Sequence, residues 1–297
     1  RCGIFMALTD LTLDLLSPAK INLFLSVTGR RLNGYHELAT LMVCIDLYDR
    51  IVLTFTGHDI RLACDTPGIP KDESNLAFRA ALLFQNVYRQ YRGHPPFTGL
   101  AIQLHKTIPA GAGLGGGSGN AATVLKALNR QVKDPLSPEH LSALALKLGA
   151  DVPFFMVGQP AVATGIGEQL APWPDLPSYS LVVVFPGGGL ATGEIYRSLN
   201  LRLTNCEKKL KGFPLKHGMF DAAVHLCNDL ESVAMQRCPD IALIKKELNR
   251  LGALGALMSG SGSSVFGLFA SADKARKARQ RLVTRAEWQV FQAKLLV

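Results

Sequence analysis

Alternation of apolar and polar residues marks the first part of the chain as a series of β-strands. A period of two runs over residues 21–28 and returns over residues 51–55. Between these stretches lie the tight-turn pair Asn33-Gly34 and an apolar run over residues 38–45. A two-residue turn beside such runs is typical of a hairpin. We therefore predict antiparallel strands in this part of the chain.

Helical spacing follows further along the chain. Ser74 is placed to cap a helix whose apolar face would comprise Leu76, Ala80, Leu83, Val87 and Tyr91. A short strand is predicted at residues 102–104. After a glycine-rich stretch, a second helix is predicted from an apolar face of Ala121, Leu125 and Leu128. A third runs from the cap pair Ser137-Pro138 to Gly149, which suits a C-terminal cap.

The second half of the chain has a different order of elements. A proline-rich stretch at residues 169–178 predicts a linker, so we expect an N-terminal domain over residues 1–168 and a C-terminal domain over residues 169–297. Beyond the linker we predict a strand at residues 181–185 and two helices at residues 219–236 and 240–251. Two strands, near residue 256 and at residues 265–269, would flank a serine-glycine turn. A basic helix at residues 274–285 and a last strand near residue 288 would follow. This order fits an α+β layer of the ferredoxin-like kind.

Composition changes this picture mainly through charge. The 297 residues carry a formal net charge of +9, and much of the surplus lies in residues 208–216 and 274–285. In the second stretch the apolar positions recur at helical spacing, which predicts a solvated basic helix face. Nucleic-acid binding is not favoured, because aromatic residues are not interleaved with the basic ones. No apolar run reaches the roughly 20 residues of a membrane span, and we expect the cytoplasm as the compartment.

Six glycines lie between residues 111 and 119, in the stretch PAGAGLGGGSGNAAT. Glycine permits positive φ and lets backbone N–H groups approach a ligand closely. The helix that follows adds the positive end of its dipole. We therefore predict a loop that binds the phosphates of a nucleotide. The alternatives are a mobile loop and glycines needed only for close packing.

Two known phosphate motifs do not account for this stretch. A Walker loop needs a Lys-Ser or Lys-Thr pair, which is missing here. Gly111, Gly113 and Gly116 match the GxGxxG pattern of dinucleotide sites, but that is a weak signal. Such a site also needs an acidic residue about 20 residues further on, and the nearest candidate, Asp134, lies in a predicted loop.

Transfer of a phosphoryl group to a hydroxyl also needs a carboxylate and a cation near the acceptor. Asp151 comes directly after the predicted helix end at Gly149, and Lys20 opens the first strand. Taken alone, Asp151 is equally explained as a turn former and Lys20 as a surface charge. Both are therefore candidates at this point.

Four segments, in this order, closely resemble the GHMP small-molecule kinases: SPAKINLFLSVTGRRLNGYHEL, IPAGAGLGGGSGNAATVLKALN, LGADVPFF and LMSGSGSSVFGLF. The resemblance covers nearly the whole chain from Ser17. It implies the two-domain α+β architecture of that family, with a ribosomal protein S5 domain 2-like N-terminal domain and a ferredoxin-like C-terminal domain. PAKINLFL and GYHEL are similar to the branch that uses ATP and Mg²⁺ to phosphorylate the 2-hydroxyl of a cytidine diphosphate-linked methylerythritol, in the non-mevalonate isoprenoid pathway.

The resemblance also implies roles for single residues at the reacting centre. Asp151 would be the base that takes the proton from the acceptor hydroxyl, and Lys20 would orient Asp151 and stabilise the alkoxide. The ATP phosphates would be wrapped by Pro109, Ala110, Gly111, Ala112, Gly113, Leu114, Gly115, Gly116, Gly117, Ser118 and Gly119.

Further residues are implied for the small-molecule substrate. Asn22 would hold it near the reacting centre. Tyr35 and Tyr196 would sandwich the cytosine, and His36 would read the edge of that base. Residues 260–264 of the serine-glycine turn, which comprises residues 259–264, would close the site from the second domain.

One departure from the family pattern affects the metal. Two serines commonly follow the glycines in this family, and here the second is Gly119. A hydroxyl near the phosphates or the metal is therefore expected to be missing, leaving Ser118 as the polar contact and the metal ligands open. Three other functions stay possible: another GHMP kinase acting on homoserine, mevalonate or a sugar, a dinucleotide-dependent oxidoreductase, and a non-catalytic nucleotide-binding module.

Overall fold

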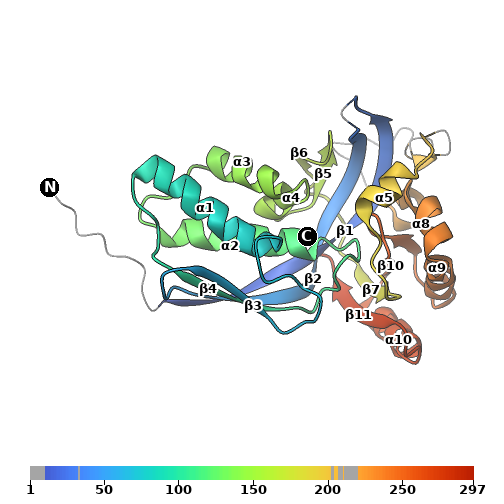
Figure 1. Ribbon diagram of the computed structural model, residues 1–297. Helices are drawn as coiled ribbons and strands as arrows, with labels where there is room; N and C mark the ends of the chain where they lie inside the picture. Colours follow the sequence, from blue (N-terminus) through green and yellow to red (C-terminus); the bar gives the residue numbers. More distant parts are fainter. Residues whose placement is uncertain (1–10, 33, 202–203, 207–209, 211–219) are drawn as a thin grey trace. The chain divides into compact units, whose positions relative to one another are not determined.

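The computed structural model describes residues 11–32, 34–201, 204–206, 210 and 220–297 (Figure 1). The chain folds into two compact units, each built from separate stretches. Unit 1 comprises the chain up to Pro18, residues 48–108 and residues 116–157, and unit 2 comprises residues 19–47, 109–115 and 158–297. The two predicted domains were instead separated by a single cut after residue 168, and that division stays a prediction.

Two strands of 19 residues each, β1 (Thr12–Arg30) and β2 (His36–Thr54), run through both units. The apolar run and the second alternating stretch, which we expected to be separate strands, are both part of β2. In β1, every residue from Ala19 to Val27 is buried. This stretch of the strand is therefore covered on both faces, and its polar residues Lys20, Asn22 and Ser26 are inside the protein. The predicted turn residue Asn33 lies outside the described residues.

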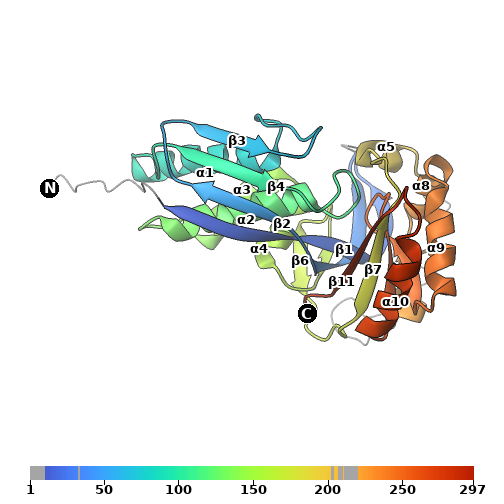
Figure 2. The same cartoon turned by 90° about the horizontal axis from the view of Figure 1, so that it is seen from below.

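Unit 1 places its helices on one side of its strands (Figures 1 and 2). β3 (Ile60–Cys64) runs parallel to β4 (Leu100–His105), and β4 pairs antiparallel with the end of β2, where Arg50 lies opposite His105. The helices are α1 (Leu76–Arg92), α2 (Gly116–Gln131), α3 (Pro138–Leu148) and α4 (Val152–Val157). α2 is the helix predicted after the glycines, and its predicted apolar face is buried.

The predictions for the ends of these helices differ in success. Ser137 caps α3 as predicted, since its side chain accepts a hydrogen bond from the His140 N–H. The predicted cap of α1 was wrong by one residue. Asn75 accepts a hydrogen bond from the Ala77 N–H, whereas Ser74 hydrogen-bonds Asp72.

The buried face of α1 was also misplaced. It comprises Ala77, Ala80, Ala81, Phe84 and Tyr88. Tyr91, which we expected on this face, is 55% exposed. Apolar positions three or four residues apart form both the predicted and the observed face, so spacing alone did not decide which face is buried.

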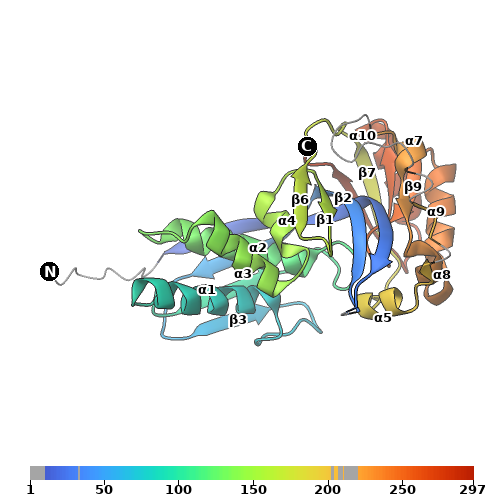
Figure 3. The same cartoon turned by 90° about the horizontal axis from the view of Figure 1, so that it is seen from above.

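Unit 2 contains the predicted ferredoxin-like layer (Figure 3). Four antiparallel strands are hydrogen-bonded in the order β11-β7-β10-β9, with bounds Gln289–Lys294, Ser180–Phe185, Val265–Phe269 and Gly255–Met258. One core joins this sheet to three helices, α8 (Glu231–Arg237), α9 (Asp240–Arg250) and α10 (Ala272–Leu282). The chain order and strand order are those of a ferredoxin-like layer.

Two predictions in this half of the chain were wrong. The proline-rich linker begins as a strand, because β6 (Gln169–Pro172) pairs with β5 (Ala161–Thr164), and Trp173 behind it is buried. The helix expected over residues 219–236 is interrupted. α7 (Ala222–His225) and α8 are separated by the two-residue strand β8 (Cys227–Asn228), which runs parallel to β1. Residue 219 lies outside the described residues. The helix α5 (Thr192–Arg197) lies between β7 and α7 in the chain and carries Tyr196.

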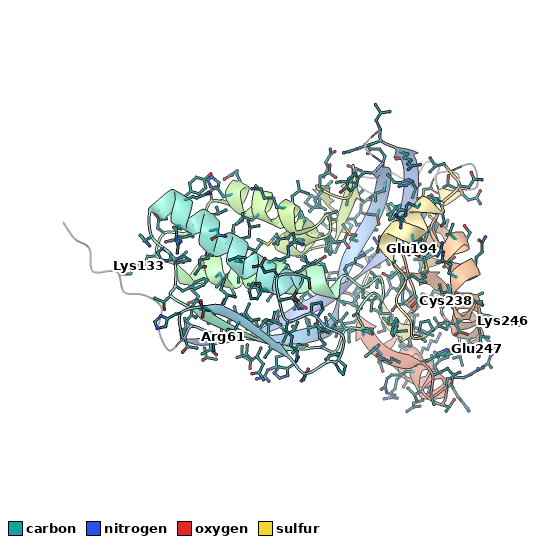
Figure 4. The ribbon with its side chains drawn as sticks, viewed as in Figure 1. Arg61, Lys133, Glu194, Cys238, Lys246 and Glu247 are labelled. Carbon is teal, nitrogen blue, oxygen red and sulfur yellow. The ribbon has the colours of Figure 1, made fainter. Side chains whose placement is uncertain are left out.

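The basic surplus is on exposed side chains where the structure describes it. α10 buries Ala275, Ala278 and Leu282 and turns its basic residues to solvent, as predicted. Lys246 of α9 and Lys133 after α2 are likewise exposed (Figure 4). Among the described residues, no helix has the length and apolar character needed to cross a membrane.

Candidate active site

The glycine stretch begins in unit 2 as a loop with unusual backbone conformation. Gly111, Gly113 and Gly115 have φ values of 65°, 76° and 67°, in the left-handed region that residues with a Cβ seldom adopt. Every second residue of the loop therefore has a left-handed conformation. Such a backbone can direct successive N–H groups toward one point, which a regular strand or helix does not do. This is the backbone geometry expected of an anion-binding loop.

Close packing is a second reason for these glycines. A Cβ on Gly113 would lie 2.1 Å from the Ser259 carbonyl oxygen, and one on Gly111 would lie 3.3 Å from the Gly189 Cα. The first distance is impossible without moving backbone. Close packing therefore requires a glycine at position 113, and phosphate binding by the loop stays a prediction.

The serine-glycine turn over residues 259–264 holds this loop in place. Ser259 Oγ donates a hydrogen bond to the Gly113 carbonyl at 2.9 Å, and the Ser264 N–H donates to the Ala112 carbonyl at 3.1 Å. Ser263 Oγ donates to the Gly188 carbonyl at 2.9 Å. The turn and the loop are thus one hydrogen-bonded structure within unit 2.

Lys20 and Asn22 lie beside this turn. Both side chains are buried, and Lys20 Nζ donates to Asn22 Oδ1 at 2.7 Å. Asn22 Nδ2 donates to Thr40 Oγ1 at 2.8 Å, and that hydroxyl donates to the Phe24 carbonyl at 2.6 Å. The chain of hydrogen bonds fixes the position of the Lys20 ammonium, so Asn22 orients Lys20 in addition to any contact with a substrate.

In unit 1 the glycine stretch continues as the first turn of α2. This helix starts at Gly116 and has no acidic residue in its first turn, so the positive end of its dipole is not neutralised there. The Lys106 ammonium lies beside this turn, since a Cβ on Gly116 would lie 3.1 Å from Lys106 Nζ, but its charge is paired with the Asp49 carboxylate. The helix dipole favours a bound anion at the start of α2.

A buried carboxylate holds this region together. Asp49 is fully buried, forms an ion pair with Lys106, and accepts hydrogen bonds at 2.9 Å from the N–H groups of Thr107 and Ile108. It also accepts a hydrogen bond from Asn120 Nδ2 at 3.0 Å. Asp49 therefore links the segment after β4 to the N-terminal part of α2, the two elements on either side of the glycine stretch.

The structure gives a physical reason for the missing second serine. A Cβ on Gly119 would lie 2.7 Å from the Pro18 carbonyl and 3.0 Å from Ser17 Oγ. A side chain at this position would point at the backbone before Lys20, and there is no room for it. The Ser17 hydroxyl accepts a hydrogen bond from Asn120 Nδ2 at 3.0 Å, so a hydroxyl is still present beside Gly119.

Asp151 belongs to unit 1 and directly precedes α4, a helix whose start is fixed by a hydrogen bond from the Val152 N–H to the Gly149 carbonyl at 3.1 Å. Its side chain is half-buried. Lys20 belongs to unit 2, and the predicted pairing of the two residues stays a prediction.

The three residues expected around the cytosine differ in exposure. His36 and Tyr196 lie together, with ring centroids 5.2 Å apart and an interplanar angle of 33°. His36 is buried, and burial, followed by the charge of Arg30, lowers its pKa below the ordinary value. Tyr35 is 60% exposed. The sandwich of Tyr35 and Tyr196 stays a prediction.

A metal site formed by the protein alone is not present in the part of the chain that the structure describes. There, no three His, Cys, Asp or Glu side chains gather in an arrangement that could hold a metal ion. Mg²⁺ stays a prediction, and its ligands stay open.

Sequence reasoning missed several residues that shape the site. Asp49, Lys106 and Thr40 are among them, as is Asn228, which hydrogen-bonds the serine-glycine turn. Their partners lie far away along the chain, for example 57 residues between Asp49 and Lys106. No local spacing signals such pairs. The one available signal was a charged or amide residue within an apolar segment.

Family models match both halves of the chain. The model described as GHMP kinases N terminal domain matches residues 75–159, and the model described as GHMP kinases C terminal matches residues 214–287. The first match contains the start of α2 and Asp151, and the second contains the serine-glycine turn.

Curated relatives match over nearly their whole length. A protein of Syntrophotalea carbinolica named 4-diphosphocytidyl-2-C-methyl-D-erythritol kinase is 48% identical over 279 residues, which are 93% of this chain and 96% of the relative. Proteins with the same name from Syntrophus aciditrophicus and Geobacter metallireducens are 44% and 42% identical, covering 94% and 96% of this chain and 98% and 99% of the relatives.

Solved structures agree with these relatives. A crystal structure of 4-(cytidine 5'-diphospho)-2C-methyl-D-erythritol kinase has a TM-score of 0.76 at 38% identity and covers 95% of this chain and 99% of that one. A homoserine kinase of Cytophaga hutchinsonii has a TM-score of 0.70 at 19% identity, covering 99% and 97%, and shows the shared fold alone. The chain therefore belongs to the GHMP kinase family, together with its relatives named 4-diphosphocytidyl-2-C-methyl-D-erythritol kinase.

Proposed function

We propose that this protein transfers a phosphoryl group from ATP to the 2-hydroxyl of 4-diphosphocytidyl-2-C-methyl-D-erythritol, a step of the non-mevalonate isoprenoid pathway. The observation that carries the proposal is the glycine loop, which holds three residues at positive φ and leads directly into an α2 start without acidic residues. The names of the relatives, at 42–48% identity, support the choice of acceptor.

The loop and the start of α2 would hold the triphosphate of ATP. Backbone N–H groups at residues 111–117 contribute hydrogen bonds, and the helix dipole contributes positive potential. Mg²⁺ would come with the nucleotide, bound by phosphate oxygens, and would neutralise charge as it develops.

Asp151 and Lys20 would act on the acceptor. The Asp151 carboxylate takes the proton of the 2-hydroxyl, which leaves the oxygen able to attack phosphorus. The Lys20 ammonium stabilises negative charge on that oxygen, and its hydrogen bond to Asn22 holds it in place before the substrate binds. A charge held in advance needs no reorganisation during the reaction.

The cytidine half of the acceptor would bind at the end of the β1–β2 hairpin. His36 and Tyr196 supply a buried polar ring beside an aromatic one, a combination that suits hydrogen bonding and stacking with a base. Tyr35 would complete the stack from the solvent side. No nucleic-acid or membrane partner is proposed, and the cytoplasmic location stays a prediction.

Selectivity among acceptors tests the proposal. We would measure kcat/KM with MgATP for 4-diphosphocytidyl-2-C-methyl-D-erythritol, homoserine and mevalonate. We expect turnover with the cytidine compound alone. Turnover of homoserine or mevalonate instead would identify another GHMP kinase, and ATP binding without turnover of any of the three would favour a nucleotide-binding module.

A further inference from the structure

The end of β8 and the segment that follows it carry three polar side chains that hydrogen-bond backbone groups elsewhere in unit 2. Asn228, Asp229 and Glu231 lie in the sequence CNDLES, and Asn228 and Asp229 are buried. The proposed reaction uses none of the three. Asn228 and Glu231 both contact Met258, which directly precedes the serine-glycine turn, whereas Asp229 contacts other segments, so the role of Asp229 can be separated from that of Asn228.

Asn228 uses its side-chain amide on the serine-glycine turn. Its Nδ2 group donates to the Met258 carbonyl at 2.9 Å and to the Gly260 carbonyl at 2.7 Å, while its Oδ1 accepts from the Leu230 N–H at 2.9 Å. Two donors and one acceptor are used at once. Among side chains of this size, a primary amide alone supplies that set.

Gly260 connects this amide to the reacting centre. A Cβ on Gly260 would lie 3.1 Å from the Gly113 carbonyl, 3.4 Å from Lys20 Nζ and 3.5 Å from Asn22 Oδ1. The turn therefore packs directly on the Lys20–Asn22 pair and on the glycine loop. A shift of the turn by a few tenths of an ångström would change the position of both.

Glu231 holds the same end of the turn, because it bonds the N–H of the residue whose carbonyl Asn228 bonds. Its Oε1 accepts a hydrogen bond from the Met258 N–H at 2.9 Å, and its Oε2 forms an ion pair with Lys245. Asp229 differs, because its carboxylate accepts hydrogen bonds from the N–H groups of Val27, Asn205 and Cys206, at 2.8, 2.8 and 3.0 Å. These three hydrogen bonds of Asp229 all go to segments other than the turn.

We propose that Asn228 is a positioning residue for phosphoryl transfer. Through its hydrogen bonds to the carbonyls on both sides of Ser259, it sets the place of Gly260 against Lys20 and the glycine loop. The inference rests on the proposed kinase function, and it assigns Asn228 no direct contact with either substrate.

The test is Asn228→Asp, which keeps the shape and replaces two donors with oxygens that repel the two carbonyls. Loss of two hydrogen bonds of ordinary strength predicts that kcat/KM for ATP falls by about tenfold or more near pH 8. Burial and the carboxylates of Asp229 and Glu231 raise the pKa of the new carboxyl, against the ammonium of Lys245. Near pH 6 the protonated carboxyl would donate one hydrogen bond, so the activity relative to the unaltered protein should rise again.

Asp229→Asn is the matched control. It alters the neighbouring buried residue and removes an acceptor for backbone N–H groups, so it should lower the melting temperature. The folded protein should keep its kcat and its KM for ATP, with no pH-dependent recovery. A role of Asn228 in folding alone would make the two variants behave alike.

Two outcomes overturn the proposal. One is a folded Asn228→Asp protein with unaltered kcat and KM for ATP near pH 8, and the other is a loss of activity whose ratio to the unaltered protein does not change with pH. If that variant does not fold, Asn228→Ser keeps one donor and should show a smaller loss; unaltered kinetics in a folded Ser variant would also overturn it. If the unaltered protein fails to phosphorylate the cytidine compound, the kinase proposal fails, and the affinity of the variants for ATP, measured by melting shift, still tests the positioning role.

Discussion

Asn22 illustrates how a buried polar residue on an apolar strand acquires a function. An unpaired amide inside a protein costs roughly 1–3 kcal/mol, and Asn22 avoids this cost through Lys20 and Thr40. The same hydrogen bonds hold the Lys20 ammonium at a fixed place. The hydrogen bonds that satisfy the buried Asn22 amide therefore also hold the ammonium in one position. A fixed charge of this kind is what electrostatic stabilisation of a developing charge requires.

Asp151→Asn tests the base. The substitution keeps the shape and removes the proton acceptor, and general-base catalysis is typically worth about 100- to 10,000-fold in rate. We expect kcat to fall in that range with little change in the Kd of either substrate. Asp134→Asn serves as the control, since Asp134 pairs with Arg92 on the surface of unit 1 and its loss should leave kcat unaltered. Near-normal kcat in Asp151→Asn would remove this residue from the mechanism.

Tyr35→Ala and Tyr196→Ala test the cytosine site. Each should weaken binding of the cytidine compound by roughly 1–3 kcal/mol if the rings stack on the base, while ATP binding should hardly change. Tyr91→Ala is a matched control, because Tyr91 is also an exposed tyrosine beside a histidine, with its ring 4.3 Å from that of His140. If the two site variants bind the cytidine compound normally and lose ATP, the two pockets have been exchanged in our assignment.

His36 gives the site a dependence on pH. Because burial lowers its pKa below the ordinary 6.5, His36 is neutral at pH 7 and protonates only on the acid side of 6.5. The KM for the cytidine compound should therefore rise as pH falls below that value, and the KM for ATP should stay flat. The unfolded chain binds this proton at higher pH than the folded one, so the contribution to stability is present above 6.5 and is lost as pH falls. An identical pH profile of KM in His36→Asn would contradict the role.

At the scale of elements, two substitutions in the glycine stretch distinguish its close packing from its proposed binding of ATP. Gly113→Ala places a Cβ 2.1 Å from the Ser259 carbonyl, so it should lower the melting temperature by several degrees even without ligand.

Gly115→Val forces a β-branched residue toward a φ of 67°, which such residues strongly disfavour. Gly115 is half-buried, in contrast to its buried neighbour Leu114, so we expect Gly115→Val to keep most of the melting temperature and to lose ATP-induced stabilisation, about 2.7 kcal/mol at 100 times Kd. An unstable Gly115→Val protein that still binds ATP would show that packing is the sole purpose of this glycine.

Elements with strong local signals were predictable from the sequence. The cap and proline at the start of α3 fix that helix, and the apolar run of β7 fixes a strand, because each signal comes from neighbouring residues. The helix expected over residues 219–236 failed for the opposite reason. Pairing of β8 with β1, about 200 residues away, interrupts a segment whose own composition favours a helix. Tertiary contacts outweigh a weak local preference.

In the candidate site, too, residues with a local signal in the sequence were predictable, and residues defined by distant contacts were not. Lys20, His36, Asp151 and the glycines were reached from motifs, since the chemistry requires those residue types at those places in the chain. Asp49 and Asn228 were not reached, because their function lies in hydrogen bonds to distant backbone groups. Gly119 was interpreted as a lost hydroxyl, and no signal in the sequence indicated the steric reason for glycine, which is that the Pro18 carbonyl occupies the space of a side chain.

At the scale of the whole molecule, the proposed reaction requires one chain to supply a nucleotide loop, a cation, a base and a cytosine site for a single transfer. The most direct measurement is a ³¹P NMR spectrum of the product formed from MgATP and 4-diphosphocytidyl-2-C-methyl-D-erythritol. We predict a new phosphomonoester on the 2-oxygen, formed together with an equal amount of ADP, and no such signal with Asp151→Asn over the same time. A phosphate on another hydroxyl, or ADP formed without a phosphorylated product, would contradict the proposed transfer.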